Sequence, residues 1–149
     1  MDKITINTGL FSFVLVDEIK DIDTETIKGA KHFSNAPIYL GVESLAQLGA
    51  LHIRFLTGFE RHAFLLKINH FNMPEKPVLN RRYLLEGRRI HHSGQAFSYL
   101  LQARKGSSIR FYGEFLFATV SYDRSFNKEI LQNHYKKVFL CLQSGSKTD

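Results

Sequence analysis

The sequence predicts an α+β fold in which an antiparallel β-sheet wraps around one long central α-helix. Positions 40–57, LGVESLAQLGALHIRFLT, contain good helix formers and no proline, and are apolar around most of their circumference, which indicates a buried helix. Two strand-like segments precede this helix and four follow it. Because the later strands are joined largely by tight turns, we expect antiparallel pairing, and the single helix would cover the apolar face of the sheet.

The chain before the helix is predicted to form two strands. Positions 10–19, LFSFVLVDEI, are rich in Phe, Val and Leu, as is typical of a buried strand. Acidic and threonine residues at 21–25 predict a turn, and 26–33 a second strand. The loop at 34–37 then leads into the helix, which we expect to end at Gly58.

Four strands are predicted after the helix, at 63–71, 82–91, 96–103 and 111–121. Pro74 and Pro77 must end the first of them, since proline cannot join a central ladder. Gly94 and the segment 105–108 mark the turns between the last three. Positions 124–149 contain a helix-like segment and a polar end. No repeat or linker divides the chain, so we expect one domain, with a core at 1–123 and a helical tail at 124–149.

Composition restricts the function classes. The single cysteine, Cys141, excludes an internal disulfide framework and a multi-thiolate metal site. No apolar run is long enough to span a membrane, and the polar start MDKITIN does not resemble a signal peptide, so a cytoplasmic location is expected. The net charge of +6 favours an acidic partner. No pattern points to a metal or a cofactor.

Glu43 is the polar residue that stands out in the apolar helix. A carboxylate in a buried helix costs free energy unless it is paired, hydrogen-bonded or lining a cavity. The pattern leaves two interpretations of Glu43 open. In the first, it is a capping acid favoured by the N-terminal dipole or part of the outer stripe of an amphipathic helix, and in the second it lines a binding site. Gln47 lies one turn further on and shares its face.

These residues resemble a known family, the hotdog-fold 3-hydroxyacyl-[acyl-carrier-protein] dehydratases, and most of all the divergent branch of aryl-polyene clusters. The resemblance covers roughly positions 10–122. Its most specific part is 41–47, GVESLAQ, preceded by Pro37. LFSFVLVDEI resembles the first strand of these enzymes, and FLLKINHFNMPEKP at 64–77 resembles the strand after the helix with its proline-bearing bend. The resemblance implies a hotdog fold and a homodimer or higher oligomer.

The resemblance also implies roles for individual residues. In the family, an acid at the start of the central helix and a histidine share an active site across a dimer interface. The acid corresponds to Glu43, and Gln47 would orient it. Dehydration of a 3-hydroxyacyl thioester needs a base for the proton next to the carbonyl and an acid for the departing hydroxyl. Backbone N–H groups at the helix start can polarise the thioester oxygen, which makes Tyr39, Leu40 and Gly41 expected wall residues.

The histidine is open to two interpretations. Family members carry His-Phe and a longer Pro/Gly-rich loop before the helix, whereas His32-Phe33 here is followed by only three residues before Pro37. Either the loop is shortened and His32 is the catalytic base, or His32 is a strand residue and the catalytic histidine is absent. His70 could line the pocket from the next strand, or occupy an ordinary strand position. His52 lies on the helix face opposite Glu43, so we expect it to be packed or interfacial.

The arginines allow two further interpretations. Arg54 and the pairs at 81–82, 88–89 and 104–105 could form a positive rim for an acyl-carrier protein or for CoA phosphates, or they could be an ordinary solvated surface. Nucleic-acid binding would add stacking aromatics such as Tyr83, Tyr99 and Tyr112, but these alternate with apolar residues in predicted strands, which favours the core. We therefore expect no nucleic acid and no membrane among the partners.

The sequence thus predicts a 3-hydroxyacyl-thioester dehydratase-like hydro-lyase with Glu43, His32 and Gln47 as catalytic residues. Two alternatives remain. An acyl-thioester hydrolase on the same fold would use Glu43 to activate water and would need no histidine. A non-catalytic acyl-thioester binding protein would have kept the tunnel without the base.

Overall fold

The computed structural model describes residues 14–74, 76, 78–122 and 128–143. Its two helices are α1 (Ile38–Leu56) and α2 (Lys128–Gln143). Its strands are β1 (Glu18–Ile22), β2 (Thr26–His32), β3 (Ala36–Pro37), β4 (Arg61–Asn72), β5 (Val78–Leu79), β6 (Arg82–Ser93), β7 (Ala96–Lys105) and β8 (Ser108–Ser121). None of the helices in these residues is long and apolar enough to cross a membrane.

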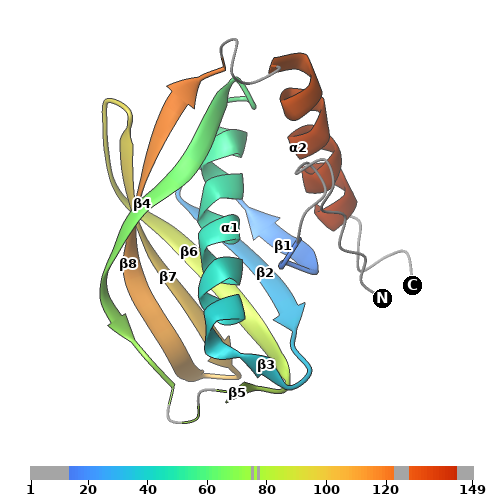
Figure 1. The fold of residues 1–149 in the computed structure, drawn as a ribbon, viewed down its shortest axis with the longest axis vertical. Helices are drawn as coiled ribbons and strands as arrows, with labels where there is room; N and C mark the ends of the chain where they lie inside the picture. The colour runs from blue at the N-terminus through green and yellow to red at the C-terminus, as the bar shows by residue number, and fades with distance from the viewer. Residues whose placement is uncertain (1–13, 75, 77, 123–127, 144–149) are drawn as a thin grey trace.

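The main sheet has six strands in the order β1-β2-β6-β7-β8-β4, and every neighbouring pair is antiparallel. Figure 1 shows this sheet curving around α1, with α2 standing beside α1 and next to β1 at one edge of the sheet. Strands β3 and β5 form a separate two-stranded sheet near the start of α1. The predicted hotdog arrangement is therefore confirmed.

The sheet-facing side of α1 packs against aromatic rings of β8. A Cβ atom on Gly41 would lie 2.7 Å from the Phe111 Cζ atom, and one on Gly49 would lie 2.7 Å from the Phe117 Cζ atom. Both phenyl rings are fully buried. Gly41 and Gly49 therefore allow α1 to lie closer to the sheet than any other residue would permit.

A histidine and a tyrosine share a polar contact inside this core. His52 of α1 is fully buried, and its Nδ1 atom accepts a hydrogen bond from the Tyr99 hydroxyl. Its Nε2 atom donates to the Asp23 carbonyl over 2.7 Å, which ties the β1–β2 turn to the helix. Burial lowers the pKa of His52, so the neutral ring is the folded form. The expectation that His52 is packed is confirmed.

The first predicted strand begins later than expected. Of the segment 10–19, residues 10–13 lie outside the described part, residues 14–17 are not strand, and β1 starts at Glu18. The physical reason is a competing partner, because the Leu15 backbone N–H donates to the Gln47 side-chain oxygen over 2.8 Å. This bond ties the segment to α1 rather than to a ladder. Tyr83 and Tyr99 are buried as predicted, but Tyr112 is an exception because it points to solvent on β8.

Helix α2 packs through an aromatic contact. Phe139 stacks on Phe55, with ring centroids 5.6 Å apart, and meets Phe59 edge-on at 5.5 Å. Helix α2 as a whole contacts α1 and β1. The helix-like segment expected within 124–149 is therefore a helix at 128–143, while the division into a core at 1–123 and a tail of the same domain stays a prediction.

We predict that Gly49→Ala destabilises the protein. Overpacking against the Phe117 ring costs about 1–3 kcal/mol, which exceeds the gain of up to ~1 kcal/mol from replacing glycine inside a helix. Urea unfolding followed by circular dichroism measures the difference. An unchanged or higher unfolding midpoint would show that α1 has room to move away from the sheet.

We predict that stability falls as the pH decreases below 6.5, the ordinary pKa of a histidine, partly through His52. Because the folded-state pKa is lowered, the unfolded chain takes up the proton first, so the stabilisation is complete above pH 6.5 and is lost below it. His52→Gln keeps a donor for the Asp23 carbonyl but does not titrate.

Thermal melts between pH 8 and about 5 should therefore show a weaker pH dependence for His52→Gln than for the wild type. His91→Gln, which changes an exposed histidine of β6, is the matched control and should keep the wild-type slope. Equal slopes for wild type and His52→Gln would contradict the prediction.

Candidate functional site: a cleft along the open face of α1

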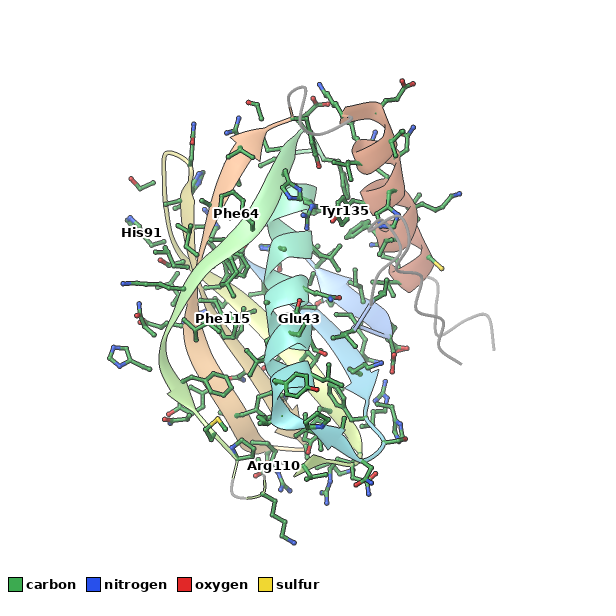
Figure 2. The ribbon with its side chains drawn as sticks, viewed as in Figure 1. Glu43, Phe64, His91, Arg110, Phe115 and Tyr135 are labelled. Carbon is green, nitrogen blue, oxygen red and sulfur yellow. The ribbon has the colours of Figure 1, made fainter. Side chains whose placement is uncertain are left out.

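One face of α1 lines a cleft of about 280 Å³. Its floor is formed by α1 residues with helical spacing, and its sides by residues 63–65 of β4, residues 134, 135 and 138 of α2, Val14 and Phe117. Figure 2 shows Glu43 on the side of α1 turned away from the sheet, with Phe64 of β4 and Tyr135 of α2 nearer its other end. The cleft therefore runs along the open face of α1.

Glu43 lies at one end of this cleft. It is the sixth residue of α1, and the first turn of the helix contains no acid, so Glu43 is not an N-terminal capping residue. Its carboxylate is exposed in the single chain and faces the cleft rather than the sheet. Glu43 thus lies beside a cleft, as the interpretation that it lines a binding site requires.

Gln47 lines the same cleft one turn further along α1. Its side-chain oxygen accepts the hydrogen bond from the Leu15 backbone, which brings Val14 to the wall of the cleft. The structure thus places Glu43 and Gln47 together, and it gives the amide a second task, that of holding the N-terminal segment. The role of Gln47 in orienting Glu43 stays a prediction.

The other predicted site residues lie outside the cleft of the single chain. His32 is exposed at the end of β2, and its backbone N–H donates to an Asp17 carboxylate oxygen over 2.7 Å. Tyr39 is 68% exposed, and Leu40 packs at the edge of the core.

Gly41 and His70 also lie elsewhere. Gly41 is buried against Leu79 and Phe111, so its close approach is to the core. His70 is exposed on β4, in an irregular part of the strand where its φ is +52°.

Arg54 forms the opposite end of the cleft, which differs from the surface rim expected from the sequence. Its side chain is only 5% exposed. The Nη2 atom donates to the Ala63 carbonyl at 2.9 Å and to His62 Nδ1 at 3.2 Å. The guanidinium lies 3.8 Å from the ring centroid of Tyr135, within the range of a cation–π interaction. These partners come from β4 and α2, so only the fold brings them to Arg54.

The groups around Arg54 are held neutral. Burial, with the nearby Arg54 charge as a second cause, lowers the pKa of His62 to about 4. Burial and Arg54 also lower the pKa of His134. Burial lowers the pKa of Arg54 itself, while Tyr135 and Tyr122 oppose this change. Among the described residues that line this end of the cleft, Arg54 is therefore a cation surrounded by neutral polar groups, and Lys137 acts on His134 from outside the lining.

The spacing along α1 relates the two ends. Glu43 and Arg54 are eleven residues apart on one helix face, which corresponds to about 16 Å at 1.5 Å per residue. Ala46, Ala50 and Leu51 line the space between them. The cleft therefore suits an elongated, mainly apolar molecule with polar ends. Among the described residues, no group of three His, Cys, Asp or Glu side chains could hold a metal ion.

The other arginines that the sequence placed in a positive rim differ in their surroundings, because some form ion pairs and others are exposed. Arg104 forms an ion pair with Glu86 at 2.8 Å, and Arg82 one with Glu18 at 3.3 Å. Arg81 and Arg88 are exposed. The positive surface predicted from the sequence is thus partly neutralised along β6 and β7.

Comparison with known proteins identifies one similar sequence among curated proteins. The chain is 35% identical over 105 residues to the 3-hydroxyacyl-[acyl-carrier-protein] dehydratase FabZ of Protochlamydia amoebophila (strain UWE25). The alignment covers 57% of this chain and 66% of the relative, so the chain spans just under two thirds of its length. No protein-family model matches the chain.

Solved structures share the fold at low identity. The dehydratase heterocomplex ApeI:P from Xenorhabdus doucetiae matches with a TM-score of 0.61 at 10% identity, over 79% of this chain and 89% of the other. A mutant of the thioesterase PA1618 from Pseudomonas aeruginosa matches with a TM-score of 0.56 at 13% identity, over 69% of this chain and 80% of the other. The resemblance seen in the sequence is thereby confirmed, and the chain is a hotdog-fold protein related to the 3-hydroxyacyl-[acyl-carrier-protein] dehydratases.

Proposed function

We propose that this chain acts on acyl thioesters and that its reaction is the dehydration of a 3-hydroxyacyl thioester. The observation that carries the proposal is the position of Glu43 at one end of an elongated cleft with an apolar floor. The sequence relative is a dehydratase, and the fold neighbours include a dehydratase and a thioesterase. Either reaction requires the thioester to lie beside an acidic side chain, in a site that limits the access of water.

In the proposed reaction, Glu43 protonates the departing 3-hydroxyl group, which leaves as water. A base removes the proton next to the thioester carbonyl, and its electron pair forms the new double bond. His32 is the candidate base. In the single chain it lies outside the cleft, so it would have to come from a second copy, with the partner subunit's His32 meeting Glu43. The bond from its backbone to Asp17 fixes the strand end from which it projects.

A homodimer would supply that histidine. Strand β4 is at the edge of the sheet and spans 12 residues. Its consecutive residues Phe64, Leu65 and Leu66 are 38%, 36% and 53% exposed. Because neighbouring side chains of a strand point to opposite faces, both faces of this edge are apolar, and long uncovered apolar edges are sites of strand pairing. A second copy pairing there would also roof the cleft.

The proposed carrier of the acyl group is an acyl-carrier protein or CoA. The net charge of +6 and the exposed Arg81, Arg88 and Lys105 favour an acidic carrier. A cytoplasmic location fits such a substrate and is part of the same proposal.

A thioester hydrolase is the second candidate, and the position of His32 favours it. Hydrolysis needs Glu43 to activate a water molecule and does not need a histidine in the cleft. A binding protein without turnover is the third candidate, in which the cleft holds the thioester but no base reaches it.

We predict that Glu43→Gln lowers dehydration of a 3-hydroxyacyl-carrier thioester by roughly 10²–10⁴-fold, because the amide cannot transfer the proton. Mass spectrometry of the product distinguishes the candidates, since the enoyl thioester indicates dehydration and free carrier thiol indicates hydrolysis. Glu25→Gln, at an exposed position of the β1–β2 turn, is the control and should retain activity. Full dehydratase activity in Glu43→Gln would remove Glu43 from the mechanism.

We predict that Leu66→Lys turns the dimer into a monomer, because it places a charge on the apolar edge of β4. Sedimentation velocity at several protein concentrations measures the change. Ile90→Lys is the matched control, since Ile90 is 51% exposed on β6, away from this edge. The β4 interface is excluded if the wild type is monomeric, or if both variants remain dimeric.

A further inference from the structure

We propose that the Arg54 end of the cleft is a carboxylate subsite, which binds the terminal carboxylate of an acyl chain whose thioester lies at Glu43. The preferred substrate is then the half-thioester of a dicarboxylic acid rather than a methyl-ended acyl group. The thioester end of this assignment rests on the proposed function. The carboxylate end rests on the surroundings of Arg54 alone.

Arg54 has no counter-charge among the described residues. Removing a cation from water costs several kcal/mol unless it is paired, and a buried arginine normally has a carboxylate partner. None of the ion pairs among the described residues includes Arg54. Its partners among the described residues are a carbonyl, an imidazole and the face of an aromatic ring, and all of them are neutral.

The Arg54 side chain also has an unused hydrogen-bond donor. The Nε atom of Arg54 is buried and has no hydrogen-bond partner among the described residues. A buried donor without an acceptor costs about 1–3 kcal/mol. Arg54 lines the cleft, so an acceptor that enters the cleft can reach this side chain. A carboxylate beside the guanidinium supplies the missing negative charge, and it supplies the acceptor for Nε after a small movement, because this atom has almost no accessible surface in the free chain.

The charges at this end favour a carboxylate. His62 and His134 are neutral around Arg54, and Lys137, which also lowers the pKa of His134, does not line the cleft, so among the described lining residues at this end Arg54 is the one positive charge. A monoanionic carboxylate balances it, whereas a phosphate monoester would leave excess negative charge in a buried place. The phosphodiester that joins a pantetheine arm to a carrier protein also carries one negative charge, so the test below includes phosphopantetheine. The lining between the two ends is mainly apolar, with Ala46, Ala50 and Leu51, and so it matches the methylene chain of an acyl group.

The experiment measures binding to the wild-type protein and therefore does not depend on turnover. The probes are amide analogues of N-acetylcysteamine thioesters, in which NH replaces the thioester sulfur and the acyl group has no 3-hydroxyl, so the protein can neither dehydrate nor hydrolyse them. They form a graded series of chain lengths, each with a terminal carboxylate, its methyl ester or a terminal methyl group, and they contain no phosphate. We expect the carboxylate probe of the best length to bind roughly ten-fold or more tightly than its two matched partners, as a charged hydrogen bond provides. Isothermal titration calorimetry gives the dissociation constants.

Two variants link this preference to Arg54. Arg54→Met keeps the length of the side chain without the charge, and should reduce the preference to within about three-fold, which is below 1 kcal/mol. Arg54→Lys keeps the charge and should retain part of the preference. Arg110→Met, at an exposed position of β8, is the control and should bind as the wild type does. Thermal melts check that each variant is folded.

The outcomes separate this proposal from the proposed function. Equal binding of all three wild-type probe types overturns the carboxylate subsite, even if Arg54→Met does not fold. A preference for phosphopantetheine over pantetheine that Arg54→Met abolishes would assign this end to a carrier phosphate, and also overturns it. A carboxylate preference without formation of enoyl product or free thiol from the 3-hydroxyacyl-carrier thioester supports the subsite while contradicting the proposed enzyme.

Discussion

The close packing of α1 against the sheet is the constraint on which the rest of the structure depends. Gly41 and Gly49 let the helix approach the rings of Phe111 and Phe117, and any larger side chain would push it away. The helix is thereby held along the length of the curved sheet while its opposite face stays open. A rigid helix then acts as the base of the cleft and sets the separation between the groups on its open face.

That open face carries an acidic residue at one end and a basic residue at the other, and the two differ in their exposure to solvent. Glu43 remains accessible at one end, where a reacting group can reach it. Arg54 is buried at the other end, beneath Tyr135 of α2 and beside the start of β4. Because α2 is held through Phe139 against Phe55, the C-terminal helix contributes a wall to the cleft. The chain therefore combines a hotdog core with a cleft wall that its C-terminal helix supplies.

The central helix, most strands and the likeness to hotdog dehydratases could be predicted from the sequence because they depend on local patterns. Periodicity places α1 within two residues at its start, and glycine and proline mark the turns. The prediction of a strand at 10–19 was wrong over 14–17. The Leu15 backbone N–H donates instead to the side chain of Gln47, which is 32 residues away along the chain. Such a long-range bond leaves no trace in the pattern of a single segment.

The sequence by itself determined the fold class and the shared face of Glu43 and Gln47, since both follow from helical spacing. It did not determine where Arg54 or His32 lies. An arginine has the same formal charge on a surface and in a core, and only the meeting of α1 with His62 of β4 and Tyr135 of α2 decided that Arg54 is buried. The position of His32 was also decided by the tertiary structure. The pairing of β2 with β6 places the end of β2, and the distance along the chain from Glu43 does not.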